Sequence, residues 1–181
     1  MSDDLWIFAY GSLMWNPGFT PVESVLGCAH GYQRGFFMRS VHYRGTEGLP
    51  GLVLALDVCD GAHCEGMALR VAAGERDAVL SYLRERELIS YAYYEHICQL
   101  VLADGREVAA VTYVVARDHS QYAGALSLAE QAVIIARASG SAGPNRDYLN
   151  STAASLRGFA IEAEELFALQ AHVEALCRTQ N

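Results

Sequence analysis

The sequence contains no uninterrupted apolar run of about twenty residues, the length that a membrane-spanning helix requires. Its positive charge is sparse and unclustered, with 13 Lys and Arg residues against 21 Asp and Glu residues and a net charge of −8. A chain with this balance lacks the basic patch that binds nucleic acid. Its first residues, Met1-Ser2-Asp3-Asp4, are acidic where a secretory signal would be basic. We therefore expect a cytoplasmic protein that binds neither membrane nor nucleic acid.

Cysteine pairs suited to metal binding are also missing. The five cysteines are an odd number, and none of them forms a Cys-x-x-Cys pair. His63-Cys64, close to Cys59, is the one cluster that resembles part of a metal site, but zinc needs about four ligands and no second ligand pair is present. Reduced, mostly buried thiols are the default in a cytosolic chain. We predict neither a metal nor any other cofactor.

With 181 residues and 52% hydrophobic content, the chain suits one compact domain, residues 1–181, with a sizeable core. Strand patterns fill its first two thirds, with turns expected at Gly31 and Asp60-Gly61, and helical patterns fill the last third. The expected strands are 5–9, 22–28, 32–40, 52–57, 64–71, 91–102 and 108–115, and the expected helices are 75–88, 127–138, 145–157 and 163–178. Asp104-Gly105 is a strong hairpin signal, and Ser127 with Glu130 forms a capping box. This order predicts an α+β fold, whose curved antiparallel strands could close into a small barrel.

The most informative stretch is Leu5–Trp15, which reads LWIFAYGSLMW. Its first five residues are apolar or aromatic and predict a short, buried strand. The strand leads directly into Tyr10-Gly11-Ser12, where a glycine allows a turn that a side chain would obstruct. Backbone N–H groups that such a turn leaves unpaired can bind an anion. An ordinary strand that ends in a turn fits the same local pattern.

The decapeptide Phe8–Pro17, FAYGSLMWNP, resembles the opening signature of the ChaC-type γ-glutamylcyclotransferases, enzymes that cleave glutathione. Further blocks resemble the family in the same order, over roughly residues 6–175. They are Arg44-Gly45-Thr46 with Pro50–Leu56, Arg86-Glu87 with Ser90-Tyr91, His119–Gly124, Ala138–Gly140 and Asp147–Leu149. The opening signature alone would be weak evidence, whereas the signature followed by these five further blocks in order is specific.

The resemblance implies a small mixed or antiparallel β-barrel flanked by helices, and a lyase that releases 5-oxoproline and Cys-Gly from glutathione without a cofactor. Two alternatives stay open. The first is a cyclotransferase that acts on another γ-glutamyl compound, such as a γ-glutamylamine or a γ-glutamyl amino acid, and the second is a non-catalytic γ-glutamyl-binding module. A serine hydrolase, suggested by Gly11-Ser12, would need a Gly-x-Ser-x-Gly context that is absent. The oligomeric state is not indicated.

Glu87 is the candidate catalytic residue. In the expected helix it follows Leu83 by four residues and Val79 by eight, so it continues an apolar stripe, whereas Glu85 faces solvent. A carboxylate aimed at a core is costly unless it is paired or protonated. A rim position paired with Arg84 or Arg86 fits the helical spacing equally well. The resemblance favours catalysis, because Arg86-Glu87 matches the family's Arg-Glu motif.

The resemblance also implies the substrate-binding residues. They are Ala9, Tyr10, Gly11, Ser12, Leu13 and Met14 in the turn after the first strand, together with Ser40, Arg44 and Tyr148. Packing is the alternative role for Tyr148. The chain departs from the family pattern at His42 and Tyr43, where many members carry an acidic residue and a histidine. It also has Leu88-Ile89 where many members have a glycine before the aromatic residue.

Overall fold

The computed structural model describes residues 5–88, 90 and 92–179. The chain groups into two compact units, one made of Met1–Arg34 and Leu56–His119 and the other of Gly35–Ala55 and Ser120–Asn181. The single domain over residues 1–181 therefore stays a prediction. Among the described residues, no helix is long and apolar enough to cross a membrane.

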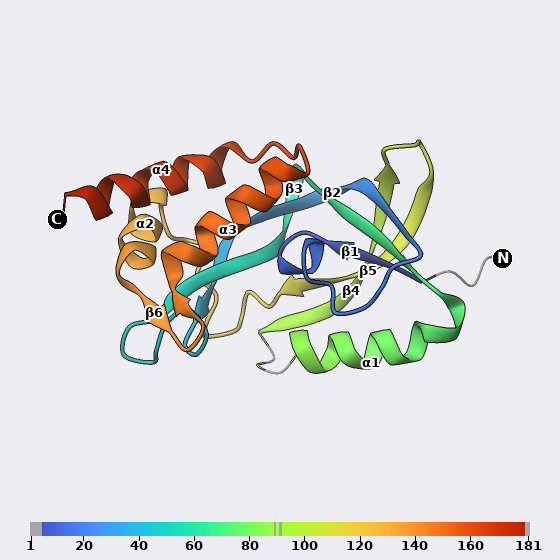
Figure 1. The fold of residues 1–181 in the computed structure, drawn as a ribbon, viewed down its shortest axis with the longest axis horizontal. Coiled ribbons are helices and arrows are strands. Elements are labelled where there is room, and N and C mark those ends of the chain that lie inside the picture. Colours follow the sequence, from blue (N-terminus) through green and yellow to red (C-terminus); the bar gives the residue numbers. More distant parts are fainter. Residues whose placement is uncertain (1–4, 89, 91, 180–181) are drawn as a thin grey trace. The chain divides into compact units, whose positions relative to one another are not determined.

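Five strands form a closed barrel in the order β1-β3-β2-β4-β5 (Figure 1). Their bounds are β1 Leu5–Ala9, β2 Glu23–Ser40, β3 Gly51–Val71, β4 Tyr93–Leu102 and β5 Glu107–Val115. The β1 strand pairs antiparallel with β3 and parallel with β5, so the barrel is mixed. The β4–β5 hairpin turns at Gly105, as the Asp-Gly signal predicts. The predicted α+β class and barrel are confirmed.

The strands β2 and β3 are longer than predicted. The sequence predicts turns at Gly31 and Asp60-Gly61, but each strand runs through its glycine without ending. Gly31 has φ +83° and Gly61 has φ +79°, values that side-chain-bearing residues rarely adopt. A glycine in this conformation is typical of a bulge, which bends a strand and lets pairing resume beyond it. The predicted breaks were therefore wrong.

In the first unit, all five residues of β1 are buried, as predicted. The 3₁₀ turn η2 (Ala73–Glu75) leads into helix α1 (Arg76–Glu87), which buries Val79 and Leu83. The α1 helix lies beside β4 and β5 (Figure 1), and Arg84 on α1 pairs with Glu95 on β4. The apolar stripe of α1 therefore fixes which way its last residues face.

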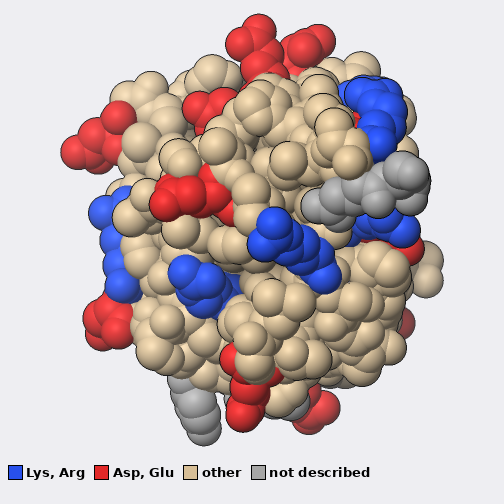
Figure 2. Space-filling model, turned by 90° about the vertical axis from the view of Figure 1, so that its left-hand side faces the viewer, with Lys and Arg blue, Asp and Glu red and all other residues tan. Residues whose placement is uncertain are grey.

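In the second unit, helices α2 (Leu128–Arg137), α3 (Asn145–Gly158) and α4 (Glu164–Arg178) pack on one another (Figure 1). The predicted capping box begins α2: the Ser127 hydroxyl accepts from the Glu130 amide, and the Glu130 carboxylate accepts from the Ser127 amide. A two-stranded ribbon, β6 (Ser139–Gly140) with β7 (Gly143–Pro144), connects α2 to α3 and was not predicted. Acidic and basic side chains alternate over the face drawn in Figure 2.

Candidate functional site

Glu87 is the last residue of α1, and its side chain is only 20% exposed. The stripe that carries it includes Val79 and Leu83, which are 5% and 0% exposed. Glu85, two residues earlier, is exposed. The helical spacing thus places one of the two carboxylates inward and the other in solvent, as the sequence predicts. Tyr91, which belongs to the same sequence block as Glu87, lies outside the described residues.

Burial raises the pKa of the Glu87 carboxyl, and the neighbouring Arg86 cation opposes this effect without cancelling it. Glu87 also acts on Tyr113 of β5, whose pKa rises because of burial first, then the nearby Glu95 charge, with a smaller contribution from Glu87. A half-buried carboxyl whose pKa lies above its ordinary value is suited to accept and return a proton near neutral pH.

The segment Ala9–Met14 forms the turn expected after β1. The 3₁₀ helix η1 (Ser12–Met14) begins there, and all of this segment except Ser12 is buried. The first hydrogen bond of the turn runs from the Met14 amide to the Gly11 carbonyl, at 2.9 Å. The amides of Ser12 and Leu13 precede that bond, and the first amides of a helix find no acceptor inside it.

Arg86 joins this turn to the end of α1. Its Nη2 donates to Ser12 Oγ at 3.0 Å, and its Nη1 donates to the Asn16 carbonyl at 2.8 Å and to the Tyr82 hydroxyl at 3.1 Å. Its Nε lies 3.3 Å from Glu87 Oε1. One guanidinium therefore contacts both the turn and the carboxylate, which brings the two main elements of the predicted site together. The sequence by itself indicates Arg86 only as a motif residue and a partner for Glu87.

Ser40, Arg44 and Tyr148 form a cluster within the second unit. Ser40 Oγ accepts from the Arg44 amide at 3.0 Å, and the Arg44 guanidinium carbon lies 5.4 Å from the centre of the Tyr148 ring. The Tyr148 hydroxyl accepts from the Leu54 amide at 3.3 Å, and its ring packs edge-on against Phe36. Packing therefore accounts for much of the position of Tyr148. A joint role of this cluster with Glu87 stays a prediction.

Asn145 is a structural residue that the sequence analysis missed. It is fully buried at the start of α3, where its Nδ2 donates to the Leu52 carbonyl and its Oδ1 accepts from the Leu52 amide, both at 2.7 Å. A Cβ on Gly51 would lie 2.7 Å from this Oδ1 and 2.2 Å from the Arg44 carbonyl oxygen, so the close approach requires glycine. The sequence feature that could have indicated this role is weak, since it is only an asparagine two residues before the Asp147-Tyr148 motif.

His42 and Tyr43, two of the departures from the family pattern, lie in one loop. The side chains of His42 and Tyr43 are exposed, and that of Tyr43 is 64% exposed. Their backbone carbonyls accept from the amides of Ser141 and Ala142, both at 2.9 Å. The backbone of this loop therefore pairs with the segment between β6 and β7 through atoms that any residue type supplies.

Two buried thiols of the first unit, those of Cys64 and Cys98, are poor nucleophiles. Cys64 and Cys98 are 3% and 2% exposed. Burial raises their pKa values to about 11 and about 12, so both are protonated at neutral pH. His63, adjacent to Cys64, is exposed. Among the residues that the structure describes, no group of three or more His, Cys, Asp or Glu is placed to hold a metal ion.

We expect chelators to leave unchanged the lyase activity that the family resemblance implies, because a carboxylate such as that of Glu87 can transfer protons without a metal. The measurement is turnover after dialysis against EDTA, with a sample dialysed against buffer alone as the control. A marked loss of activity that added Zn²⁺ or Mg²⁺ restores would contradict this expectation.

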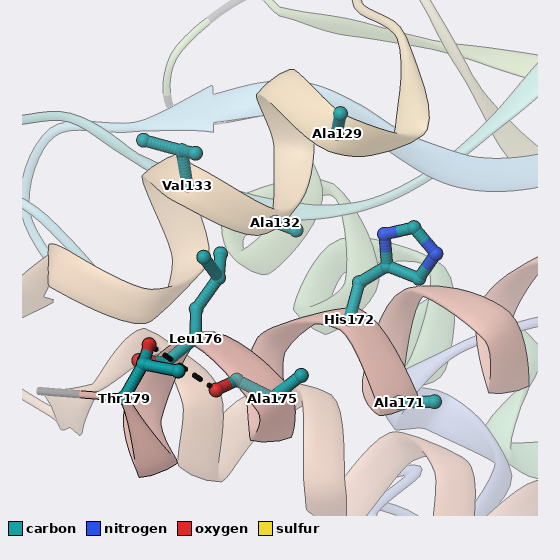
Figure 3. A pocket seen from close by; sticks show the side chains of 8 residues that line it. All are labelled: Ala129, Ala132, Val133, Ala171, His172, Ala175, Leu176 and Thr179. Atoms are coloured by element: carbon teal, nitrogen blue, oxygen red, sulfur yellow. Dashed lines mark hydrogen bonds between the residues drawn. The ribbon is translucent and has the colours of Figure 1, made fainter.

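A pocket of about 440 Å³ lies between α2 and α4 (Figure 3). Half of its lining residues are alanines, Val133 and Leu176 add apolar surface, and His172 supplies the one imidazole among its lining residues. The Thr179 hydroxyl at its end donates to the carbonyl groups of Ala175 and Leu176. The lining offers no carboxylate, so we do not assign the chemistry of Glu87 to this pocket.

The family described as ChaC-like protein matches residues 5–176. The chain belongs to this family. The match includes the turn after β1, the Arg86-Glu87 pair, and the cluster of Ser40, Arg44 and Tyr148.

Two relatives from distant organisms are similar to the chain. It is 40% identical over 147 residues to a glutathione-specific gamma-glutamylcyclotransferase of Escherichia coli, an alignment that covers 81% of this chain. It is 32% identical over 178 residues to glutathione-specific gamma-glutamylcyclotransferase 1 of Danio rerio, covering 96% of this chain and 91% of the relative. The alignment spans 63% of the Escherichia coli protein's length, so the activity of that whole protein is a proposal for this chain.

A solved structure of a yeast gamma-glutamylcyclotransferase specific to glutathione is similar to the present chain. The match covers 96% of the present chain and 97% of the yeast chain, with a TM-score of 0.85. The sequence identity in that comparison is 21%, so the likeness shows the fold alone.

Proposed function

We propose that the chain is a γ-glutamylcyclotransferase that cleaves glutathione into 5-oxoproline and Cys-Gly. The observation that carries this proposal is the half-buried Glu87 carboxylate linked through Arg86 to the turn after β1, in a chain that shares its family with curated enzymes of this activity.

In the proposed cyclisation the substrate supplies its own nucleophile, and the protein supplies orientation and proton transfer. The α-amine of a γ-glutamyl group is separated from its own γ-carbonyl by a distance that closes a five-membered lactam. Attack of that nitrogen on the carbonyl carbon forms the ring, and the bond to the next residue's nitrogen breaks. Because the nucleophile belongs to the substrate, no serine or cysteine nucleophile is required. Holding the γ-glutamyl chain in a curled conformation supplies the orientation on which the rate depends.

Protons must leave the attacking ammonium and reach the departing nitrogen. One carboxylate can carry out both transfers in turn, and we assign this role to Glu87. Burial that raises its pKa brings the carboxyl closer to the proton affinity of its partners, which improves general acid–base catalysis. Ser12 is a poor candidate nucleophile, since its hydroxyl accepts a hydrogen bond from Arg86, and a guanidinium cannot act as a base.

We assign substrate binding to the turn Ala9–Met14, whose early amides are suited to the α-carboxylate of the γ-glutamyl group. Ser40, Arg44 and Tyr148 are assigned to the remainder of the substrate. Arg44 keeps its cation beside the Tyr148 ring and donates to the Ala142 carbonyl at 2.7 Å, so contacts within the protein hold this side chain in place. A fixed cation suits an anionic peptide.

The pH dependence of kcat/KM is expected to show an acid limb that belongs to Glu87. Because burial raises its pKa, the midpoint should lie above the ordinary glutamate value of 4.5. Activity then falls as the pH drops through that midpoint, since the protonated carboxyl cannot accept a proton. Initial rates with glutathione between pH 4 and pH 9 measure it. A midpoint at or below 4.5 would contradict the assignment.

The substrate class is tested by incubating the protein with reduced glutathione and measuring 5-oxoproline and Cys-Gly. Parallel incubations with γ-Glu-Ala and γ-glutamyl-ε-lysine distinguish the alternatives. We expect turnover of glutathione well above that of the other two compounds. Preference for either of them would change the substrate, and inactivity on all three would favour a non-catalytic binding module.

A further inference from the structure

Arg86 meets four groups that belong to two separate segments of the chain. From the turn after β1 it binds the Ser12 hydroxyl and the Asn16 carbonyl, and from α1 it contacts the Tyr82 hydroxyl and the Glu87 carboxylate. Its side chain is 24% exposed, so these contacts are partly shielded from water. Because Ser12 is 74 positions from Arg86, these bonds fix a long-range relationship between the turn and the helix end.

The geometry uses features that only arginine has. A guanidinium is a planar fork with five N–H donors, so one side chain can serve several acceptors in different directions. Lysine offers the same charge as a compact point at the end of a flexible stem. Exchanging Arg86 for lysine therefore keeps the cation beside Glu87 and removes most of the geometric connection to the turn.

Arg86 is also the cation that acts on Glu87. From β5, Tyr113 faces the carboxyl, and its hydroxyl donates to Glu95 of β4 at 3.3 Å. Arg84, the other arginine near the end of α1, is paired with both Glu95 oxygens at 2.8 and 2.7 Å. The charges of Arg84 and Glu95 thus balance each other, and Arg86 is left to offset the burial of Glu87.

We propose that Arg86 is a positioning residue for the reaction: it holds the Glu87 carboxylate against the substrate-binding turn and supplies the positive charge that keeps Glu87 able to accept a proton. This inference rests on the proposed function. In the Arg-Glu dipeptide, the arginine then sets the position and charge state of the glutamate, and the glutamate transfers the proton. A purely structural arginine would stabilise the fold without affecting the titration of Glu87.

Arg86→Gln and Arg86→Lys separate the two parts of the proposal, with Arg76→Gln as the matched control. Arg76 lies at the opposite end of α1, about 15 Å from Arg86 along the helix axis. The titration of the Glu87 side-chain carboxyl is followed by NMR in ¹³C-labelled protein and assigned by its absence in Glu87→Gln. The kcat and KM for glutathione are measured on the same samples, and circular dichroism establishes that each variant is folded.

In Arg86→Gln we expect the Glu87 titration midpoint to move to higher pH, whereas in Arg86→Lys and Arg76→Gln it stays near that of the unmodified protein. Both Arg86 variants should lose about 10- to 100-fold in kcat/KM, because misplacing a reacting group by about 1 Å costs this much. If Arg86→Gln does not fold, Arg86→Lys still decides between the outcomes through its midpoint and its kcat/KM.

The inference is overturned if Arg86→Gln leaves the midpoint unchanged, or if Arg86→Lys shifts the midpoint or retains full kcat/KM. Inactivity of the unmodified protein on every γ-glutamyl compound would instead overturn the proposed function. The two failures are distinguishable, because the titration is measured on the free protein and needs no turnover.

Discussion

Replacing Glu87 with glutamine is expected to lower kcat for glutathione about 10²- to 10⁴-fold, the usual contribution of general acid–base catalysis. Glutamine keeps the size and shape of the side chain and loses the ability to accept a proton. Progress curves of 5-oxoproline release measure the effect. The matched control is Glu85→Gln, on the same helix at an exposed position, which should retain near-normal activity. Full activity of Glu87→Gln would refute the assignment.

The same substitution should not destabilise the protein. Because the pKa of Glu87 is raised in the folded state, its neutral form is favoured there. The stability that this preference contributes is fully present below the ordinary value of 4.5 and is lost as the pH rises through the raised pKa. At pH 7 a neutral amide therefore replaces a charged group that is costly to bury. We expect a thermal midpoint equal to or above that of the unmodified protein, so lost activity cannot be attributed to unfolding.

Replacing Asn145 with alanine is expected to cost about 3 kcal/mol of folding free energy, because a buried group left without its partner costs about 1–3 kcal/mol. The substitution would leave both the amide and the carbonyl of the fully buried Leu52 without their side-chain partner. Asn145→Asp should also destabilise, since a carboxylate would face the Leu52 carbonyl oxygen. Denaturant unfolding followed by circular dichroism measures the loss.

Asn150→Ala is the matched control for Asn145. Asn150 lies on the same helix, is exposed, and accepts a hydrogen bond from Gln170 at 3.0 Å. Surface substitutions of this kind usually change stability by less than about 0.5 kcal/mol. Equal losses from Asn145→Ala and Asn150→Ala would show that the pairing with Leu52 does not stabilise the fold.

Local patterns in the sequence were sufficient to predict much of the fold. The apolar run Leu5–Ala9 is a buried strand, and the spacing of Val79, Leu83 and Glu87 correctly placed that glutamate on the inner side of α1. Both depend on a periodicity that a short segment carries by itself. The breaks expected at Gly31 and Gly61 were wrong because glycine permits a bulge as readily as a turn, and strand pairing with distant segments decides between the two.

The contacts that the sequence does not reveal, one in the candidate site and one that supports the fold, are those made by distant partners. Arg86 binds Ser12 across 74 positions, and Asn145 binds Leu52 across 93 positions. Neither contact produces a repeating pattern of residue types in the sequence, because a single side chain makes each one. The motif resemblance identified Glu87 and the turn as candidates, and the structure adds the arginine that connects them.

The central claim, that the substrate's own amine displaces the neighbouring residue, is tested most directly by product analysis in ¹⁸O-labelled water. We predict equal amounts of 5-oxoproline and Cys-Gly, with no ¹⁸O in the 5-oxoproline, because water takes no part in an intramolecular amine attack. Release of glutamate that carries ¹⁸O in its γ-carboxylate would show hydrolysis and contradict the account.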